Sequence, residues 1–273
     1  MKRLIIVWTM AVTLSGCFAD TPVVDGSASR DGAEPETTSG GQISVDPGAR
    51  QTQTTSSPQV SSDMRDFLAV VLAETEDVWN AIFTEGGQQY REPTLVLFSG
   101  SVRSACGYVS AASEPFYCSD DQKVYIDLAF YDQLRPRFQA PGDFAQAYML
   151  AHEVGHHVQN LIGVLPKFNQ MRQTAGKSEA NAMSVRVELQ ADCFAGIWAN
   201  KIADKGLLEE GDIDEALNAA RLNGDDTIQK RTQGYVVPDA FNQGTSEQRQ
   251  RWFGRGFETG QLDTCDTFTP SQV

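Results

Sequence analysis

The three histidines of the chain all lie in one ten-residue stretch, AHEVGHHVQN (151–160). His152 and His156 are four residues apart, and Glu153 follows the first of them. Positions four apart on an α-helix lie one turn above each other on the same face, so both imidazoles can reach one metal ion. Chance is the alternative, because motifs with three fixed residues also occur in unrelated proteins. The gathering of every histidine in this stretch favours a metal site.

The pattern His-Glu-x-x-His is typical of zinc hydrolases, with the glutamate as general base. Zinc in such a site takes three protein ligands and keeps its fourth position for water. We therefore expect one Zn²⁺, held by His152, His156 and a third residue. Glu153 is expected to take a proton from the water that attacks a peptide carbonyl. His157 is excluded as the third ligand, because it points about 100° away from His156 around the helix.

A carboxylate or a cysteine must complete the site, and helix lengths favour Glu188. The metal-binding helix is expected over 143–161, between a capping Asp143 and Gly163. A second helix is expected over 178–204. Nine residues separate the motif centre from Gly163, and ten separate the start of the second helix from Glu188. Both arms are about 14–15 Å long at 1.5 Å per residue, so antiparallel packing places Glu188 level with the histidines.

Asp192 lies one turn beyond Glu188 on the same helix face. There it can accept a hydrogen bond from the outer nitrogen of a ligand histidine and fix the ring tautomer. The alternative for Glu188 and Asp192 is a solvated helix face that pairs with Arg186. The histidine motif favours the ligand interpretation.

The remaining elements are expected to provide a core around this helix pair. Apolar spacing predicts a helix from Ser62 to Phe83, and β-rich runs predict short strands at Thr94–Phe98 and Lys123–Leu128. Two capping boxes are expected, Asp212-x-x-Glu215 and Thr245-x-x-Gln248, each starting a further helix. An edge strand beside the metal helix is expected to hold substrate by strand addition. The fold class is therefore α+β and mainly helical, with a small sheet.

The chain begins like an exported protein. Met1-Lys2-Arg3 is a short basic region, and the apolar run Leu4–Leu14 is too short to span a bilayer as a mature helix. Leu14-Ser15-Gly16-Cys17 resembles the bacterial lipobox, which predicts cleavage before Cys17 and its acylation. An ordinary secretory signal is the alternative. We expect an extracytoplasmic protein, lipid-anchored to the bacterial cell membrane or outer membrane.

Composition divides the rest of the chain. Residues 1–16 are expected to be a signal peptide and 17–60 a disordered linker after the lipidated cysteine, since Ser, Thr, Gly, Gln, Asp and Pro dominate there. Residues 61–273 are expected to form one metallopeptidase domain. The net charge of −14 argues against nucleic acid as a partner and against a membrane contact other than the lipid anchor. A peptide or protein substrate is the expected partner, and the oligomeric state is not predicted.

Four cysteines remain after Cys17, an even number that suggests two disulfides in an exported protein. Three pairings are possible. Cys106–Cys118 is the economical local pair, and Cys193–Cys265 would then join the C-terminal tail to the second helix. A zinc role for these cysteines is disfavoured, because no C-x-x-C spacing occurs.

The histidine motif followed by Glu188-x-x-Ala191-Asp192 resembles the gluzincin metallopeptidases. The chain is most similar to the bacterial neutral zinc metallopeptidase family. The similar stretches cover most of residues 62–268: SACGYVSAASEPFYC (104–118), VYIDLAFYDQL (124–134), GDFAQAYMLAHEVGHHVQN (142–160), SVRVELQADCFAGIWA (184–199), GDIDEALNAA (211–220) and GTSEQRQRWFGRGF (244–257). The resemblance implies a zincin-like fold with His152, His156 and Glu188 as zinc ligands and Glu153 as the base.

One residue differs from what the resemblance to this family implies. Gln243 stands immediately before Gly244, where members of this family are expected to carry a histidine able to donate a hydrogen bond in the transition state. Gln243, Tyr235 or Arg249 is a candidate for that role.

The sequence leaves two candidate functions. The first is a membrane-tethered zinc peptidase; the alternative is a catalytically weak zinc-binding lipoprotein that acts as a binding or assembly partner.

Overall fold

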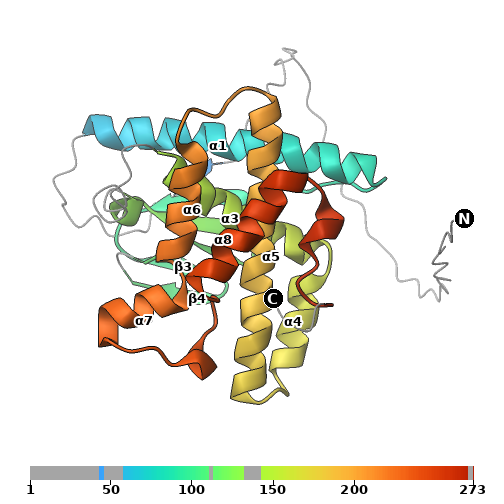
Figure 1. Ribbon diagram of the computed structural model, residues 1–273. Coiled ribbons are helices and arrows are strands. Elements are labelled where there is room, and N and C mark those ends of the chain that lie inside the picture. Colours follow the sequence, from blue (N-terminus) through green and yellow to red (C-terminus); the bar gives the residue numbers. More distant parts are fainter. Residues whose placement is uncertain (1–42, 46–57, 111–112, 132–142, 270–272) are drawn as a thin grey trace, which may run out of the picture. The chain divides into compact units, whose positions relative to one another are not determined.

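The computed structural model describes residues 43–45, 58–110, 113–131, 143–269 and 273. The predicted class, α+β and mainly helical with a small sheet, is confirmed (Figure 1). The α-helices are α1 (Pro58–Glu85), α3 (Phe144–Leu161), α4 (Val164–Arg172), α5 (Lys177–Asp204), α6 (Asp212–Leu222), α7 (Asp225–Gln233) and α8 (Ser246–Thr259). Two short 3₁₀ helices are also described: η1 (Pro238–Ala240) lies between α7 and α8, and η2 (Leu262–Cys265) follows α8.

The main sheet has four strands in the order β1-β2-β6-β5. β1 (Ile43–Val45), β2 (Thr94–Phe98) and β6 (Lys123–Asp127) are parallel, whereas β5 (Phe116–Cys118) runs antiparallel to β6. A separate hairpin joins β3 (Val102–Ser104) to β4 (Gly107–Val109). β5 is therefore an edge strand, and its other side pairs with no strand in the described part of the chain.

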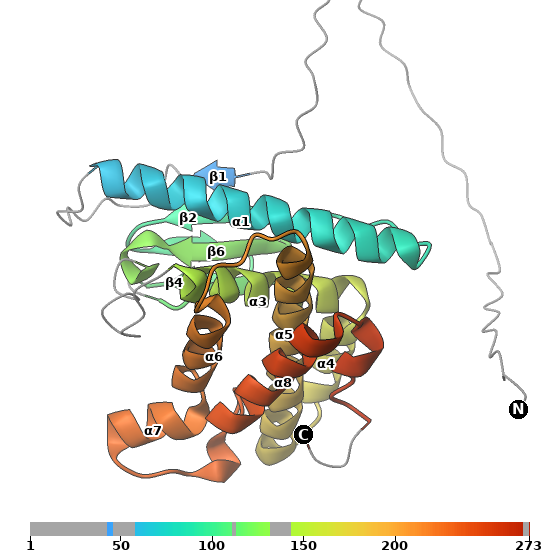
Figure 2. The same cartoon turned by 45° about the horizontal axis from the view of Figure 1, so that its top comes forward.

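Alternating side chains give the sheet two buried faces. Leu95 and Leu97 of β2 lie opposite Val124 and Ile126 of β6 and join the main core with α1 and α3. α1 runs alongside β2 and β6 (Figure 2). The residues between them point to the opposite face, where a smaller apolar cluster includes the cysteine of β5. The sheet is thus held between the helical layer and the hairpin region.

α5 packs against both α3 and α8, and glycines permit the close approach. A Cβ added at Gly155 of α3 would lie 3.0 Å from the carbonyl oxygen of Ala191 on α5. A Cβ at Gly256 of α8 would lie 1.9 Å from the carbonyl oxygen of Cys193, and one at Gly196 of α5 would lie 2.1 Å from that of Phe253. The backbones of α3 and α8 are therefore in direct contact with the backbone of α5 at these glycines. This close packing brings side chains of α5 next to the histidines of α3.

Several elements differ from the sequence prediction. α1 begins four residues earlier than the expected Ser62. α4 was not predicted; its Pro166 is the third residue of the helix, where a missing N–H costs no intrahelical bond. α7 begins directly after Gly224 and was not predicted. β5 and the β3–β4 hairpin lie between the two predicted strands and were not predicted either.

One predicted capping box is confirmed and the other is wrong. Thr245 and Gln248 exchange the two expected hydrogen bonds at the start of α8. At α6 the N-cap is Gly211, with a positive φ of 103° and no side-chain cap. Glu215 instead accepts a hydrogen bond from the backbone N–H of Phe144, at 3.2 Å. It thereby serves the N-terminus of α3, where Asp143 occupies the N-cap position without a side-chain bond.

The predicted linker is described at only a few positions. Ile43–Val45, inside the range 17–60, form β1 and pair with Leu95–Leu97 of β2. The predicted signal peptide and Cys17 lie outside the described residues. Among the helices that the structure describes, none contains a stretch both long and apolar enough to cross a bilayer.

Candidate metal centre

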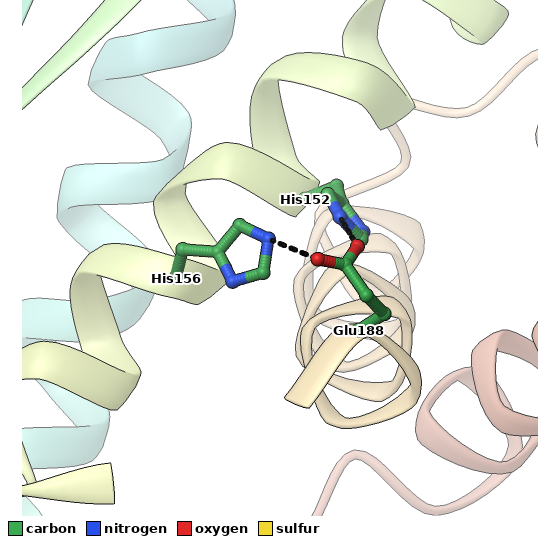
Figure 3. A group of neighbouring side chains, drawn as sticks. All are labelled: His152, His156 and Glu188. Atoms are coloured by element: carbon green, nitrogen blue, oxygen red, sulfur yellow. Dashed lines mark hydrogen bonds and ion pairs between the residues drawn. The ribbon is translucent and has the colours of Figure 1, made fainter. Parts of the chain in front are cut away.

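Two helices bring three potential ligands together. α3 carries His152 and His156 one turn apart, and α5 carries Glu188 opposite them (Figure 3). The Glu188 carboxylate lies 3.2 Å from Nε2 of His152 and 3.6 Å from Nε2 of His156. One ligand atom from each residue lies within 4.8 Å of the other two. The helices run antiparallel here, because His152 contacts Asp192 whereas His156 contacts Glu188, one turn earlier on α5.

The outer nitrogens of both rings are also engaged. Nδ1 of His152 donates to the Asp192 carboxylate at 2.9 Å, and Nδ1 of His156 donates to Oε1 of Gln159 at 2.9 Å. A carboxylate can only accept, so the His152 proton toward Asp192 belongs to the histidine. The inner nitrogens, Nε2 of both rings, therefore face Glu188.

The charges around the ligands favour a cation. Burial alone would lower the pKa of His152, but Asp192 and a hydrogen bond to Glu188 raise that pKa to about 10. Burial alone would raise the pKa of Glu188, but the two imidazoles hold it well below its ordinary value. The same negative potential that retains protons on the rings favours a divalent ion between them.

Asp192 is the centre of a buried polar network. It is fully inaccessible to solvent, and it accepts hydrogen bonds from Tyr148 at 2.5 Å and from Arg249 at 2.8 and 2.9 Å in addition to His152. Burial would raise the pKa of Asp192, but the Arg249 guanidinium keeps it below its ordinary value. Arg249 comes from α8, so a third helix fixes the residue that orients His152. The alternative that Asp192 lies on a solvated helix face and pairs with Arg186 is therefore wrong. Arg186 donates to the backbone carbonyl of Thr267.

Glu153 lies in the pocket beside these ligands. Burial raises its pKa above the ordinary value, and the nearby His156 and His152 offset part of this effect. No hydrogen bond to its carboxylate is found among the described residues. Such a carboxylate accepts a proton more readily than an exposed one, as general-base catalysis requires.

A pocket of about 260 Å³ opens onto the ligands. One wall is the stretch Glu114–Tyr117, which ends in edge strand β5. The lining also includes Asn223, Gln243 and Arg249, which come from the C-terminal part of the chain. The ligands thus share one pocket with residues of an edge strand and with residues of the C-terminal region.

The loop that carries Gln243 is held by one buried carboxylate. The backbone N–H groups of Asn242, Gln243 and Gly244 all donate to Oδ2 of Asp225, at 2.8, 2.6 and 2.9 Å. The side-chain oxygen of Gln243 accepts from Arg249 at 3.3 Å. Since a guanidinium can only donate, the amide NH₂ of Gln243 is the end left to serve a ligand. Tyr235 is exposed and does not line this pocket.

The chain matches a known family over most of its length. A model of the family described as "Putative neutral zinc metallopeptidase" matches residues 29–268. The chain belongs to this family. Uncharacterized protein YpfJ of Escherichia coli K12 is 48% identical over 231 residues, which cover 85% of this chain and 80% of that protein. Uncharacterized proteins Mb2605 of Mycobacterium bovis and Rv2575 of Mycobacterium tuberculosis are each 38% identical over 226 residues, covering 79% of this chain and 75% of those proteins.

No solved structure matches the chain. The family of neutral zinc metallopeptidases implies zinc, and the donor set fits this ion. Two imidazole nitrogens and one carboxylate oxygen are ligands that zinc takes in hydrolytic sites. Both imidazoles have their outer nitrogens fixed by acceptors, as is usual for zinc-bound histidines.

The third histidine of the chain has a different environment. His157 donates from Nε2 to the backbone carbonyl of Arg91 at 2.6 Å, and its Nδ1 accepts from the Tyr117 hydroxyl at 3.0 Å. Burial lowers the pKa of His157 to about 4, so the ring is neutral at pH 7. His157 ties α3 to the strand side of the pocket, and it does not face the ligands.

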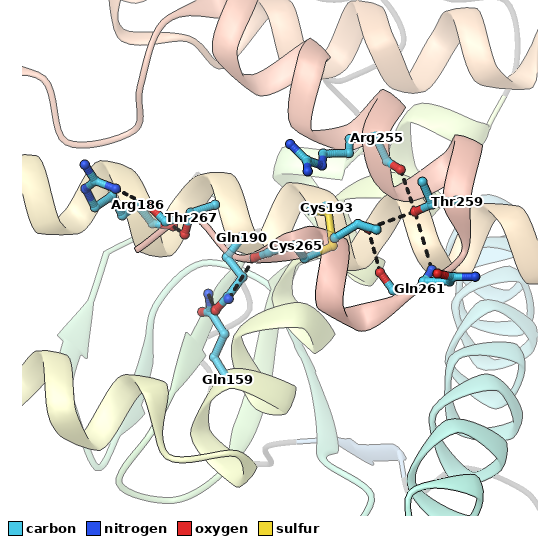
Figure 4. The surroundings of a disulfide bond; sticks show 10 residues. Gln159, Arg186, Gln190, Cys193, Arg255, Thr259, Gln261, Cys265 and Thr267 are labelled. Carbon is cyan, nitrogen blue, oxygen red and sulfur yellow. Dashed lines mark hydrogen bonds between the residues drawn. A yellow bond between two sulfur atoms is a disulfide. The ribbon is translucent and has the colours of Figure 1, made fainter. Parts of the chain in front are cut away.

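Both predicted disulfides are present. Cys106–Cys118 joins the turn of the β3–β4 hairpin to the last residue of β5, and Cys193–Cys265 joins α5 to η2 (Figure 4). The tail is held further by Thr267, whose hydroxyl donates to the carbonyl of Arg186 at 2.6 Å. The local pairing was therefore the correct choice among the three.

Tyr148 and Gln159 were missed by sequence reasoning, as was Arg249 as the partner of Asp192. The spacing of Gln159, three residues after His156, was the available signal, because such a pair shares a helix face. Tyr148 lies four residues before His152 and was open to the same argument. Nothing local indicated that Arg249 would reach α5.

Proposed function

We propose that this protein is an extracytoplasmic, lipid-anchored zinc peptidase that hydrolyses peptide bonds, with Glu153 as its general base. Family membership supports a zinc peptidase. The observation that carries the proposal is the convergence of His152, His156 and Glu188 in the pocket that also contains the Glu153 carboxylate. We assign one zinc ion to these three ligands.

The reaction needs an activated water and a stabilised oxyanion. When bound, zinc supplies Lewis acidity, which polarises the scissile carbonyl and lowers the pKa of a coordinated water toward ~7. Glu153 accepts the proton of the attacking water and then delivers it to the leaving amine. Asp192 holds His152 in the tautomer with Nδ1 protonated, and Arg249 in turn holds Asp192.

The oxyanion donor is assigned to Gln243. Arg249 fixes the orientation of its amide, so the NH₂ group is the donor. Arg249 itself is a weaker candidate, because its guanidinium already donates to Asp192, to the carbonyl of Asn223 and to Gln243. The NH₂ group of Gln243 is a donor at any pH. A histidine in its place would donate from one ring nitrogen when neutral and from both only when protonated.

Substrate binding is assigned to the edge of β5. This strand pairs with β6 on one side, and the stretch Glu114–Tyr117 lines the pocket. An extended peptide can add to such an edge through main-chain hydrogen bonds, which bind substrates with little dependence on side-chain sequence. The scissile bond would then lie across the three ligands.

The location outside the cytoplasm is supported by two features. The basic start, short apolar run and Cys17 fit a lipoprotein signal. Two disulfides fit an oxidising compartment. Membrane fractionation of the native protein and of a Cys17→Ser variant tests the anchor; a membrane-bound Cys17→Ser protein would contradict it.

The central test is cleavage of a mixed peptide library with zinc, with chelator, and with zinc restored. Wild type should cleave only with zinc, and Glu153→Gln should bind zinc without cleaving. Glu179→Gln, an exposed charge removed from α5, is the matched control and should cleave like wild type. Full cleavage by Glu153→Gln would refute the assigned base. Zinc binding without cleavage by wild type would favour the alternative, a zinc-binding lipoprotein that acts as a binding partner.

A further inference from the structure

A chain of buried amides links His156 to the disulfide-bonded tail. Oε1 of Gln159 accepts from Nδ1 of His156 at 2.9 Å. Nε2 of Gln159 donates to Oε1 of Gln190 at 3.1 Å, and Nε2 of Gln190 donates to the backbone carbonyl of Cys265 at 3.0 Å (Figure 4). Gln159, Gln190 and Cys265 are all buried. This series of hydrogen bonds, from His156 through Gln159 and Gln190 to Cys265, is called the relay below. It runs through the protein interior, where hydrogen bonds are not exchanged for bonds to water.

Carbonyl groups fix the direction of every bond in this relay. The Gln159 amide nitrogen also donates to the backbone carbonyl of Val187, at 2.8 Å. A carbonyl can only accept, so the nitrogen of Gln159 faces α5 and its oxygen faces His156. An oxygen at that place requires a proton on Nδ1 of His156, which leaves the lone pair of a neutral ring on Nε2, toward Glu188. The carbonyl of Cys265 orients Gln190 by the same argument.

The far end of the relay is held covalently. Cys265 is bonded to Cys193, three residues after Gln190 on α5. The disulfide thus holds the Cys265 carbonyl beside the Gln190 side chain. Within the described part of the chain, this carbonyl is the acceptor at the end of the relay.

We propose that Gln159 and Gln190 are positioning residues for His156, and that the Cys193–Cys265 disulfide anchors them. Gln159 sets the tautomer and the ring angle of His156, and Gln190 sets the orientation of Gln159. Loss of either amide, or of the disulfide, weakens zinc binding through the same path. This inference rests on the proposed zinc site, and it adds residues that act on His156 in the way Asp192 acts on His152.

Zinc affinity of the folded protein, measured by competition with a chelating dye, tests the relay. Gln159→Met keeps the side-chain length and removes its hydrogen bonds, and it should weaken zinc about 10-fold or more, the usual range for groups that orient a ligand. Gln190→Met and the double variant Cys193→Ala/Cys265→Ala should each weaken zinc by a smaller factor. Gln146→Met is the matched control. Gln146 is a buried glutamine of α3 that donates to the carbonyl of Tyr131, and its loss should leave zinc affinity unchanged.

A serial relay also predicts non-additivity. Gln159→Met combined with Gln190→Met should bind zinc as weakly as Gln159→Met alone, and the cysteine double substitution should add nothing to Gln190→Met. Thermal unfolding of each zinc-free variant separates this role from a structural one, because Gln146→Met should lose stability without losing zinc affinity. If Gln159→Met does not fold, the cycle between Gln190→Met and the cysteine variant still decides.

Two outcomes would overturn the relay. One is unchanged zinc affinity in folded Gln159→Met or, where that variant does not fold, in Gln190→Met. The other is strictly additive losses. Both leave the proposed function intact, provided wild type binds one zinc. A wild-type protein that binds no zinc would refute the proposed site itself, so the two failures are distinguishable.

Discussion

Asp192→Asn removes the negative charge at the centre of the buried network and changes the shape of the side chain very little. Asp192 has no solvent exposure, and its two oxygens accept bonds from Tyr148, His152 and Arg249. The Arg249 side chain is only 4% exposed. An asparagine offers one oxygen and one NH₂ group, so at least one donor of the network meets another donor, and the guanidinium loses its counter-charge.

The magnitude follows from these contacts. Removing one partner of a buried ion pair costs about 3–5 kcal/mol, because the remaining charge stays desolvated. We expect the free energy of unfolding of Asp192→Asn to fall by that amount in the absence of zinc. His152 also loses its orienting carboxylate, so zinc affinity should fall about 10- to 100-fold. A second substitution, Arg249→Met, removes the stranded charge and should restore about 1 kcal/mol or more to Asp192→Asn.

Urea unfolding at pH 7 with excess chelator measures the first quantity, and dye competition on the folded protein measures the second. The reasoning would be refuted if Asp192→Asn lost less than about 1 kcal/mol and bound zinc like wild type. It would also be refuted if Arg249→Met and Asp192→Asn had additive effects, because the ion pair would then carry no coupling energy.

Three further predictions concern Gln243 in the pocket, the buried Glu76 of α1, and Gly256 where α8 crosses α5. Gln243→Leu should lower kcat about 10²-fold with unchanged zinc affinity, since it removes the proposed oxyanion donor; steady-state kinetics and zinc titration on one sample check both quantities. Glu76 is buried, and this burial, reinforced by Glu92 and Asp77, raises its pKa from 4.5 to about 7. Protonation of Glu76 therefore favours the folded state: this stabilisation is fully present below pH 4.5 and is lost as the pH rises through about 7. Urea unfolding should show Glu76→Gln to be more stable than wild type by about 3 kcal/mol at pH 9 and equally stable at pH 4. Gly256→Ala should destabilise the protein by more than about 4 kcal/mol in the same assay, because the new methyl group would overlap the Cys193 carbonyl; a loss under 1 kcal/mol would show that α8 moves freely away from α5.

Local patterns predicted the elements whose signals lie within a few residues. The histidine motif on α3 needed only the helical period, and the Thr245–Gln248 capping box needed only a four-residue spacing. The predicted bounds of α5 differ from the observed helix by one residue. Errors arose where a distant group replaced a local one. Glu215 was predicted to cap its own helix, but it caps α3 instead, since Gly211 already provides the N-cap of α6.

Short elements were missed for a related reason. β5 has three residues, too few for alternation to identify, and its pairing with β6 defines it. α4 and α7 have nine residues each, and a proline or a glycine at their start resembled the end of the preceding element. Strand edges and short helices depend on their neighbours for stability, which their own sequence does not describe.

The sequence by itself determined the chemistry of the site: two imidazoles one turn apart on a helix that also carries Glu153, a second helix with Glu188 and Asp192 one turn apart, and four cysteines able to pair. Tertiary structure decided which of these groups meet. α3 approaches α5 at Gly155 and Ala191, and α5 approaches α8 at Gly196 and Gly256, so Asp192 of α5 finds its partners on two other helices, α3 and α8. Helical periodicity acts over a few residues, whereas these approaches depend on how whole helices pack, and no short stretch of sequence records them.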